Sequence, residues 1–151
     1  MSDTAVVTLT IPCAPEYVGT ARLTIMSVAS RMGFAVDMIE DVRMAVGEAC
    51  TKAIERSDRG RDGATSANGA DAPASTITIR SQIEPSQLVI EVEDRIPGGG
   101  EAPPPHEDIE LYPLLMGILV DEVTVEPLAE GGTRVRLVKY ADSDPGADDL
   151  T

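Results

Sequence analysis

Two charged residues, Glu48 and Lys52, lie four positions apart in the segment VGEACTKAIERS (46–57). A carboxylate can polarise a hydroxyl group for attack, and an ammonium group can neutralise phosphate charge. A Glu followed by a Lys at this spacing also forms an ordinary surface ion pair, worth about 0.2–0.5 kcal/mol in a helix. The local sequence is compatible with both a catalytic pair and a surface pair.

Both residues fall in a predicted helix that is capped by Asp37. Apolar residues recur at steps of three and four from Ile39 to Ala53, which predicts one buried face. A second helix is predicted over 16–32, and Gly33 is placed to cap its C-terminus. The residues 57–75 contain no large apolar side chain, so we expect a mobile loop there.

Five further segments alternate apolar and polar residues, as half-buried strands do. They are VVTLTI (6–11), TITIRSQI (76–83), QLVIEVED (87–94), EVTVEP (122–127) and TRVRLVKY (133–140). The apolar stretch IELYPLLMGILVDEV (109–123) predicts a short buried helix from about Leu111 or Pro113. We therefore predict a single domain over 1–140 and a disordered acidic tail over 141–151.

The order of these elements predicts the fold class. Strands that arrive as adjacent hairpins, with the helices grouped between them, favour a mostly antiparallel, mixed sheet with helices on one face. The expected class is a two-layer α/β (α+β) sandwich.

Composition excludes several kinds of function. The 151 residues include 26 acidic and 12 basic ones, giving a formal net charge of −14, and only 3% are aromatic. An acidic surface with few stacking side chains argues against nucleic acid as a partner. No apolar run reaches the roughly 18 residues of a membrane span. Cys13 and Cys50 lack the spacing of a zinc or disulfide motif, so we expect a soluble, cytoplasmic protein with no membrane partner.

Three segments in this order resemble one family. They are YVGTARLTIMSVASRMGFAVDMIEDVRMAVGEACTKAI (17–54), LVIEVED (88–94) before a glycine-rich loop, and LVDEVTVEP with GGTRVRLVKY (119–127 and 131–140). Together they resemble the RsbW-type anti-sigma factor serine kinases, which belong to the wider superfamily of gyrase, Hsp90, histidine-kinase and MutL ATP-binding domains. The resemblance implies the Bergerat, or histidine kinase-like ATPase, fold.

The first motif of that family is Glu-x-x-x-Asn on the second helix. By resemblance, Glu48 is the residue that polarises the attacking hydroxyl, whereas Lys52 stands where the family has its magnesium-binding Asn. An ammonium group has no lone pair for a metal that requires oxygen ligands. No residue is therefore assigned as a metal ligand, and a phosphate contact is the alternative role for Lys52.

The second and last motifs concern the nucleotide. By resemblance, Asp94 receives the adenine amino group, and Gly98 and Gly100 belong to the loop that approaches the nucleotide. Thr133 follows Gly132 in the family's last motif, Gly-Thr. Ile96 occupies the first glycine position of that loop, where a branched side chain cannot freely adopt positive φ.

A third motif of the family places glycine at the start of the last helix. Here Tyr112 and Pro113 stand there instead, and Pro lacks an amide for phosphate. The resemblance thus implies ATP or ADP as the cofactor. It does not imply a magnesium site, because Lys52 replaces the magnesium-binding Asn and two glycine motifs are altered.

Two functions follow from the resemblance and stay open. The first is an anti-sigma factor that sequesters an RNA polymerase sigma factor and interacts with a STAS-domain anti-anti-sigma partner, which an intact site phosphorylates on Ser or Thr. The second is a non-catalytic module of the same fold that has lost nucleotide binding. Family members generally form homodimers, and the segment 16–32 with the strand before it is the expected interface.

Overall fold

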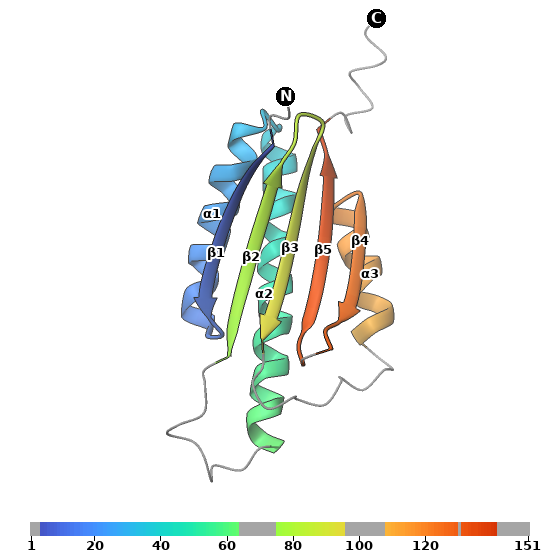
Figure 1. Ribbon diagram of the computed structural model, residues 1–151. Helices are drawn as coiled ribbons and strands as arrows, with labels where there is room; N and C mark the ends of the chain where they lie inside the picture. The colour runs from blue at the N-terminus through green and yellow to red at the C-terminus, as the bar shows by residue number, and fades with distance from the viewer. Residues whose placement is uncertain (1–3, 64–74, 96–107, 130, 142–151) are drawn as a thin grey trace, which may run out of the picture.

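The described residues of the computed structural model, 4–63, 75–95, 108–129 and 131–141, form two layers (Figure 1). A five-stranded sheet makes one layer, and the helices lie together behind it, so one face of the sheet is left open. The strands are β1 (Ala5–Pro12), β2 (Thr76–Ile83), β3 (Gln87–Arg95), β4 (Glu122–Pro127) and β5 (Thr133–Tyr140), and the helices are α1 (Val18–Arg31), α2 (Val36–Gly63) and α3 (Asp108–Leu119). The two-layer class predicted from the sequence is confirmed.

The strand order across the sheet is β1-β2-β3-β5-β4. Every neighbouring pair is antiparallel. The sheet of the described residues is therefore fully antiparallel, whereas a mostly antiparallel, mixed sheet was expected. β2 and β3 form one hairpin, while β4 turns back at the sheet edge so that β5 enters beside β3. This order places the C-terminal end of β3 next to the N-terminal end of β5.

The core lies between the sheet and the helices. Alternate residues of each strand face the helices, and the register aligns Ile11, Ile77 and Asp94 across three neighbouring strands on this face. α1 and α2 cover it with small and branched side chains that are buried, among them Ala21, Ile25, Val42, Val46 and Ala49. Burial of each large apolar side chain contributes about 1.5–3 kcal/mol.

The boundaries of α1 are close to the prediction. A short 3₁₀ turn, Pro15–Tyr17, precedes the helix, and Gly33 follows its end with φ of 72°. Its amide donates to the carbonyl of Ser30 at 3.3 Å. Gly33 therefore terminates α1 through the left-handed conformation that glycine adopts without strain.

α2 differs from the prediction at both ends. Asp37 lies in the first turn rather than at the capping position, because the helix begins at Val36. At the other end α2 continues to Gly63, so the loop boundary predicted at Ser57 is too early. Extending an existing helix adds one backbone hydrogen bond per residue, and the added residues need no apolar face of their own. The lack of large apolar residues after Ser57 therefore did not exclude a helix.

α3 is longer and less buried than predicted. It begins at Asp108, so Pro113 lies beyond its first turn. Met116 is fully buried against the core, but the opposite side is exposed. The exposed apolar side chains are Leu114 (69%), Leu115 (59%) and Ile118 (78%). An apolar residue on every side of a helix predicts full burial, but over 114–119, the part of α3 whose side chains are described, only one side meets the core.

A buried lysine links α3 to the rest of the fold. Lys139 of β5 faces the helices, and its Nζ donates to the carbonyl oxygen of Leu119 at 2.9 Å. The same Nζ lies 3.7 Å from Oδ2 of Asp41 on α2. A cation at a helix C-terminus satisfies an unpaired carbonyl and opposes the negative end of the helix dipole. Lys139 thereby fixes the end of α3 against α2 and β5.

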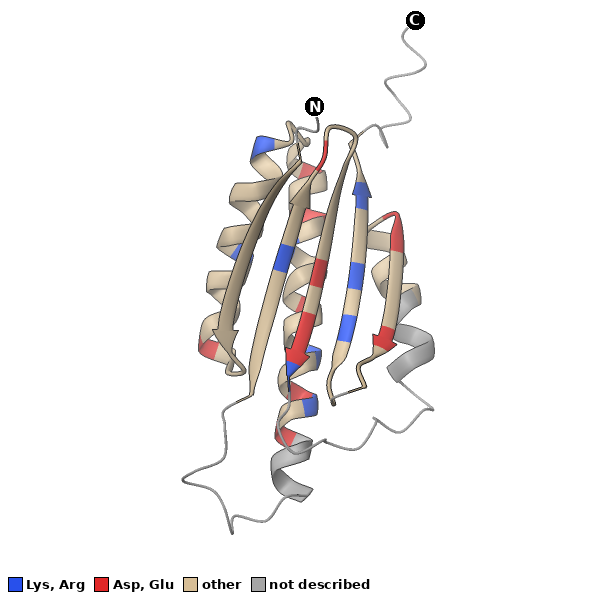
Figure 2. Ribbon diagram, viewed as in Figure 1, with Lys and Arg blue, Asp and Glu red and all other residues tan. Residues whose placement is uncertain are grey.

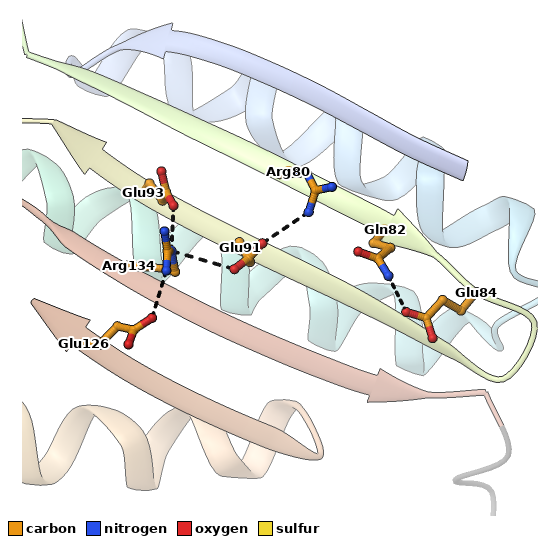
Figure 3. A network of polar contacts seen from close by, with 7 residues as sticks. All are labelled: Arg80, Gln82, Glu84, Glu91, Glu93, Glu126 and Arg134. Carbon is orange, nitrogen blue, oxygen red and sulfur yellow. Dashed lines mark hydrogen bonds and ion pairs between the residues drawn. The ribbon is translucent and has the colours of Figure 1, made fainter. Parts of the chain in front are cut away.

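Charged residues lie along the central strands (Figure 2), and several of them pair on the open face of the sheet. Arg134 on β5 contacts Glu93 at 2.6 Å, Glu126 at 3.1 Å and Glu91 at 3.7 Å, and Arg80 on β2 contacts Glu91 at 3.4 Å (Figure 3). Each exposed pair contributes about 0–1 kcal/mol. The network therefore makes this part of the open face hydrophilic. Its pairs also join neighbouring strands, so they help to set the strand register more than they stabilise the fold.

Two free cysteines are buried under the sheet, Cys13 after β1 and Cys50 on α2. Burial and the nearby Cys13 raise the pKa of Cys50 to about 12, against a smaller opposing effect of Arg22. The Cys50 thiol therefore stays protonated in the native state at neutral pH.

This pKa shift predicts that stability falls in alkali. Between about pH 8.5 and 12 the unfolded chain ionises Cys50 while the native chain does not, so the free energy of unfolding decreases as pH rises. The contribution of this group approaches about 1.4 kcal/mol per pH unit. Urea denaturation of the wild type and of Cys50→Ala across this range measures it. An identical pH dependence in both proteins would contradict the prediction.

Candidate functional site

The candidate site lies where α2 passes beyond the end of the sheet (Figure 1). Glu48, Lys52 and Arg56 follow one another at intervals of four residues along α2, which places them near one face of the helix. β3 ends and β5 begins beside this part of the helix. The site therefore combines one helix face with the ends of the two central strands.

A buried carboxylate forms the centre of the site. The Asp94 side chain has no exposed surface, and Arg56 donates to its Oδ2 from Nε at 3.0 Å and from Nη2 at 2.6 Å. The Arg56 side chain is itself only 15% exposed. Breaking such a buried pair from one side costs about 3–5 kcal/mol, because the remaining charge loses its partner. Arg56 and Asp94 thus tie α2 to β3.

The second oxygen of Asp94 is held by β5. The Thr133 amide donates to Oδ1 at 2.8 Å. Gly132, immediately before it, has φ of 120°, and a Cβ at that position would lie 2.2 Å from the Asp94 carbonyl oxygen. Only glycine permits both this conformation and this approach. The Gly-Thr sequence is therefore explained by the contact between β5 and the end of β3.

Lys52 and Glu48 lie further back along α2. Lys52 is partly buried, and its Nζ lies 3.5 Å from Oε2 of Glu55. Glu48 is exposed. The sequence spacing suggested that Lys52 pairs with Glu48, and the structure shows an ion pair of Lys52 with Glu55.

The structure brings together some of the predicted site residues. Asp94 and Thr133 are in direct contact, with Lys52 one turn and Glu48 two turns from Arg56 along α2. Gly98 and Gly100, like Ile96, lie outside the described residues. Their predicted place in a nucleotide-binding loop therefore remains a prediction.

Arg56 was missed in the sequence. Its position, four residues after Lys52 and eight after Glu48, was the available signal, because both intervals return to the same helix face. The helix was expected to end at Ser57, which made Arg56 a terminal residue with no defined direction. The continuation of α2 to Gly63 gives it that direction.

The residues of the site fit magnesium poorly. An ammonium group at Lys52 offers donors and no lone pair. Among the described residues, moreover, no three His, Cys, Asp or Glu side chains are grouped as metal ligands. Adenine fits better, since Asp94 lies at the strand end, but Arg56 and the Thr133 amide already contact both carboxylate oxygens.

Comparison with known families agrees with the fold. A profile of the histidine kinase-like ATPase domain matches residues 11–139, and the chain belongs to this family. A crystal structure of the RsbU and RsbW domains of a Mycobacterium tuberculosis protein superposes with a TM-score of 0.62. It covers 90% of this chain and 32% of the solved chain at 16% identity, so it supports the fold alone.

More similar relatives are named serine-protein kinase RsbW. The protein of Bacillus pumilus is 34% identical over 140 residues, spanning 92% of this chain and 76% of the relative. The protein of Oceanobacillus iheyensis is also 34% identical, over 139 residues with the same two shares. The resemblance drawn from the three sequence segments is thereby confirmed. Among the described residues, no helix has the length and apolarity to cross a membrane.

The approach of Gly132 to Asp94 makes a stability prediction. Gly132→Ala is expected to lower the free energy of unfolding by about 1–3 kcal/mol, because a Cβ collides with backbone and the residue must keep a positive φ. Gly117→Ala is the matched control, since a Cβ there meets nothing within 4 Å. Urea denaturation compares the two; equal effects of both substitutions would contradict the prediction.

Proposed function

We propose that this chain is an anti-sigma regulatory factor. In this role it sequesters an RNA polymerase sigma factor and also binds a STAS-domain anti-anti-sigma protein. The observation that carries the proposal is similarity over 92% of the chain to serine-protein kinases RsbW. The direct contact between Asp94 and Thr133 supports it, because these two residues also carry the family resemblance.

Several features suit such a regulator. The formal charge of −14 favours association with basic protein surfaces and disfavours nucleic acid. β1 is an edge strand on which Val6 and Val7, pointing to opposite faces of the sheet, are both exposed, and Leu23 is exposed on α1. An uncovered edge with apolar neighbours supports the homodimer expected through this part of the chain.

Reducing conditions, and hence a cytoplasmic location, suit its two free thiols.

The partner assay tests this proposal directly. The purified chain is mixed with each sigma factor and each STAS-domain protein of its source organism, and complexes are measured by size-exclusion chromatography with light scattering. Formation of one complex with a sigma factor, and its loss when a STAS-domain protein is added, is the expected result. Absence of both complexes would reject the proposed function.

A second candidate is a non-catalytic module that acts on its partners by binding alone. The Arg56 pair favours it, because the guanidinium donates twice to the carboxylate that would otherwise accept from a nucleobase. Lys52 favours it too, since it removes the oxygen ligand that magnesium requires. In a catalytic chain, Glu48 polarises the partner's hydroxyl group, and Lys52 contacts phosphate in place of metal charge.

Lys52→Asn distinguishes the two candidates. We expect wild-type binding of ATP to be independent of magnesium, and Lys52→Asn to gain a magnesium-dependent increase of about tenfold, because the amide oxygen is a metal ligand. Lys52→Met, which removes the charge without adding an oxygen, is the control. Isothermal titration calorimetry with and without magnesium provides the affinities. Tight, magnesium-dependent binding by the wild type would reject the non-catalytic candidate, and no binding by any variant at millimolar ATP would reject the kinase.

Arg56→Gln tests whether the arginine competes with nucleotide. If Arg56 occupies the position of the base, Arg56→Gln binds ADP about tenfold more tightly than the wild type, because Asp94 regains a free acceptor. Arg43→Gln is the control, since Arg43 pairs with Glu40 on the same helix. A thermal melt establishes that each variant is folded. Weaker ADP binding by Arg56→Gln would instead identify Arg56 as a residue that positions Asp94 for the base.

A further inference from the structure

The outward side of α3 is an apolar surface with no covering element among the described residues. Leu114, Leu115 and Ile118, here called the α3 patch, are all more than half exposed. Met116 and Val120, on the other side, are buried in the core. From residue 114 to residue 119 the helix contains no charged residue. A contiguous apolar surface of this kind is typical of a binding site for another protein.

The charged residues that follow the α3 patch in the sequence are all acidic. From residue 114 to residue 127 the charged residues are Asp121, Glu122 and Glu126, with no Lys or Arg among them. Asp121 accepts from the Tyr140 amide at 2.6 Å, and Glu122 contacts the Tyr140 hydroxyl, so these contacts leave both negative charges uncompensated. Glu126 is the exception, because it pairs with Arg134. The surface is therefore apolar along the helix and acidic where the chain turns into β4.

We propose that the α3 patch binds an amphipathic helix of a partner protein, with an apolar face and flanking Lys or Arg residues. The positions 114, 115 and 118 lie along one side of α3, and a second helix can pack its own apolar residues, spaced by three and four, against them. Basic residues at one end of that helix meet Asp121 and Glu122. The proposal needs no nucleotide and holds for either candidate function.

A second copy of this chain is a poorer occupant. In a symmetric contact with the two α3 helices parallel, Asp121 and Glu122 of the two copies approach each other. With the helices antiparallel, these acids approach the start of the other copy's α3, where the sequence contains Asp108 and Glu110 and no Lys or Arg. Like charges at an interface oppose association unless cations separate them. The uncompensated acids therefore favour a basic partner over self-association through this surface.

The test uses a synthetic peptide of about 18 residues, composed of Leu at helical spacing and Lys elsewhere and labelled with fluorescein. Fluorescence anisotropy measures its affinity for the wild type, for Ile118→Glu and for Val36→Glu. Val36 is 74% exposed at the start of α2 and lies outside the expected dimer segment, so both substitutions place a carboxylate at an exposed apolar position. We expect Ile118→Glu to bind about tenfold more weakly and Val36→Glu to bind like the wild type.

The comparison separates apolar docking from charge attraction. An added carboxylate by itself strengthens binding of a basic peptide, so weaker binding by Ile118→Glu alone reports loss of the apolar contact. Equal affinities of the two variants, or no binding by the wild type, would overturn the proposal. Light scattering provides a second readout: a wild-type dimer that Ile118→Glu alone dissociates would overturn it in favour of self-association.

Failure of this proposal can be told from failure of the proposed function. The same two variants enter the assay with sigma factors and STAS-domain proteins. If neither class binds the wild type, the regulatory function is rejected while the peptide result stands. If both classes bind and the peptide does not, the α3 patch is rejected alone.

Discussion

The fold depends on how one buried carboxylate is held. Asp94 lies on the helix side of the sheet, where an unpaired charge would be severely destabilising. Arg56 from α2 and the Thr133 amide from β5 each engage one of its oxygens. The close approach of Gly132 makes the second contact possible. Three elements that are distant in sequence are thereby joined at one point, and the end of the sheet where they meet is also where the site lies.

This arrangement places structural and chemical demands on the same residue. A carboxylate that accepts from an arginine and an amide contributes to native stability, but it has fewer free lone pairs for a ligand. Lys52 adds a positive charge one helical turn before Arg56, and its ammonium group attracts anions and offers no lone pair to a metal. The site therefore combines a carboxylate whose two oxygens are both engaged with a neighbouring cation.

The sequence predicts the architecture well because alternation and helical spacing report directly on which side chains face the core. The prediction fails where the local pattern does not depend on the rest of the fold. The small residues after Ser57 predicted a loop, so the continuation of α2 and the direction of the Arg56 side chain were not predicted. The apolar run ending at Leu119 predicted a buried helix, because an apolar sequence does not reveal how many sides of the helix are covered by other elements. The pairing of Arg56 with Asp94 joins residues 38 positions apart, and no local pattern encodes such a contact.

The ion-pair network on the open face has a consequence for how the molecule meets its partners. Arginine and glutamate alternate there from strand to strand, so that surface is locally close to neutral. Much of the excess of acidic residues lies elsewhere in the chain: the segments 96–113 and 141–151 together contain eight Asp and Glu residues and no Lys or Arg. A locally neutral sheet surface offers a basic protein little long-range attraction, so that attraction comes from the acidic segments instead. Raising the ionic strength would weaken this attraction first, and slow association more than it speeds dissociation.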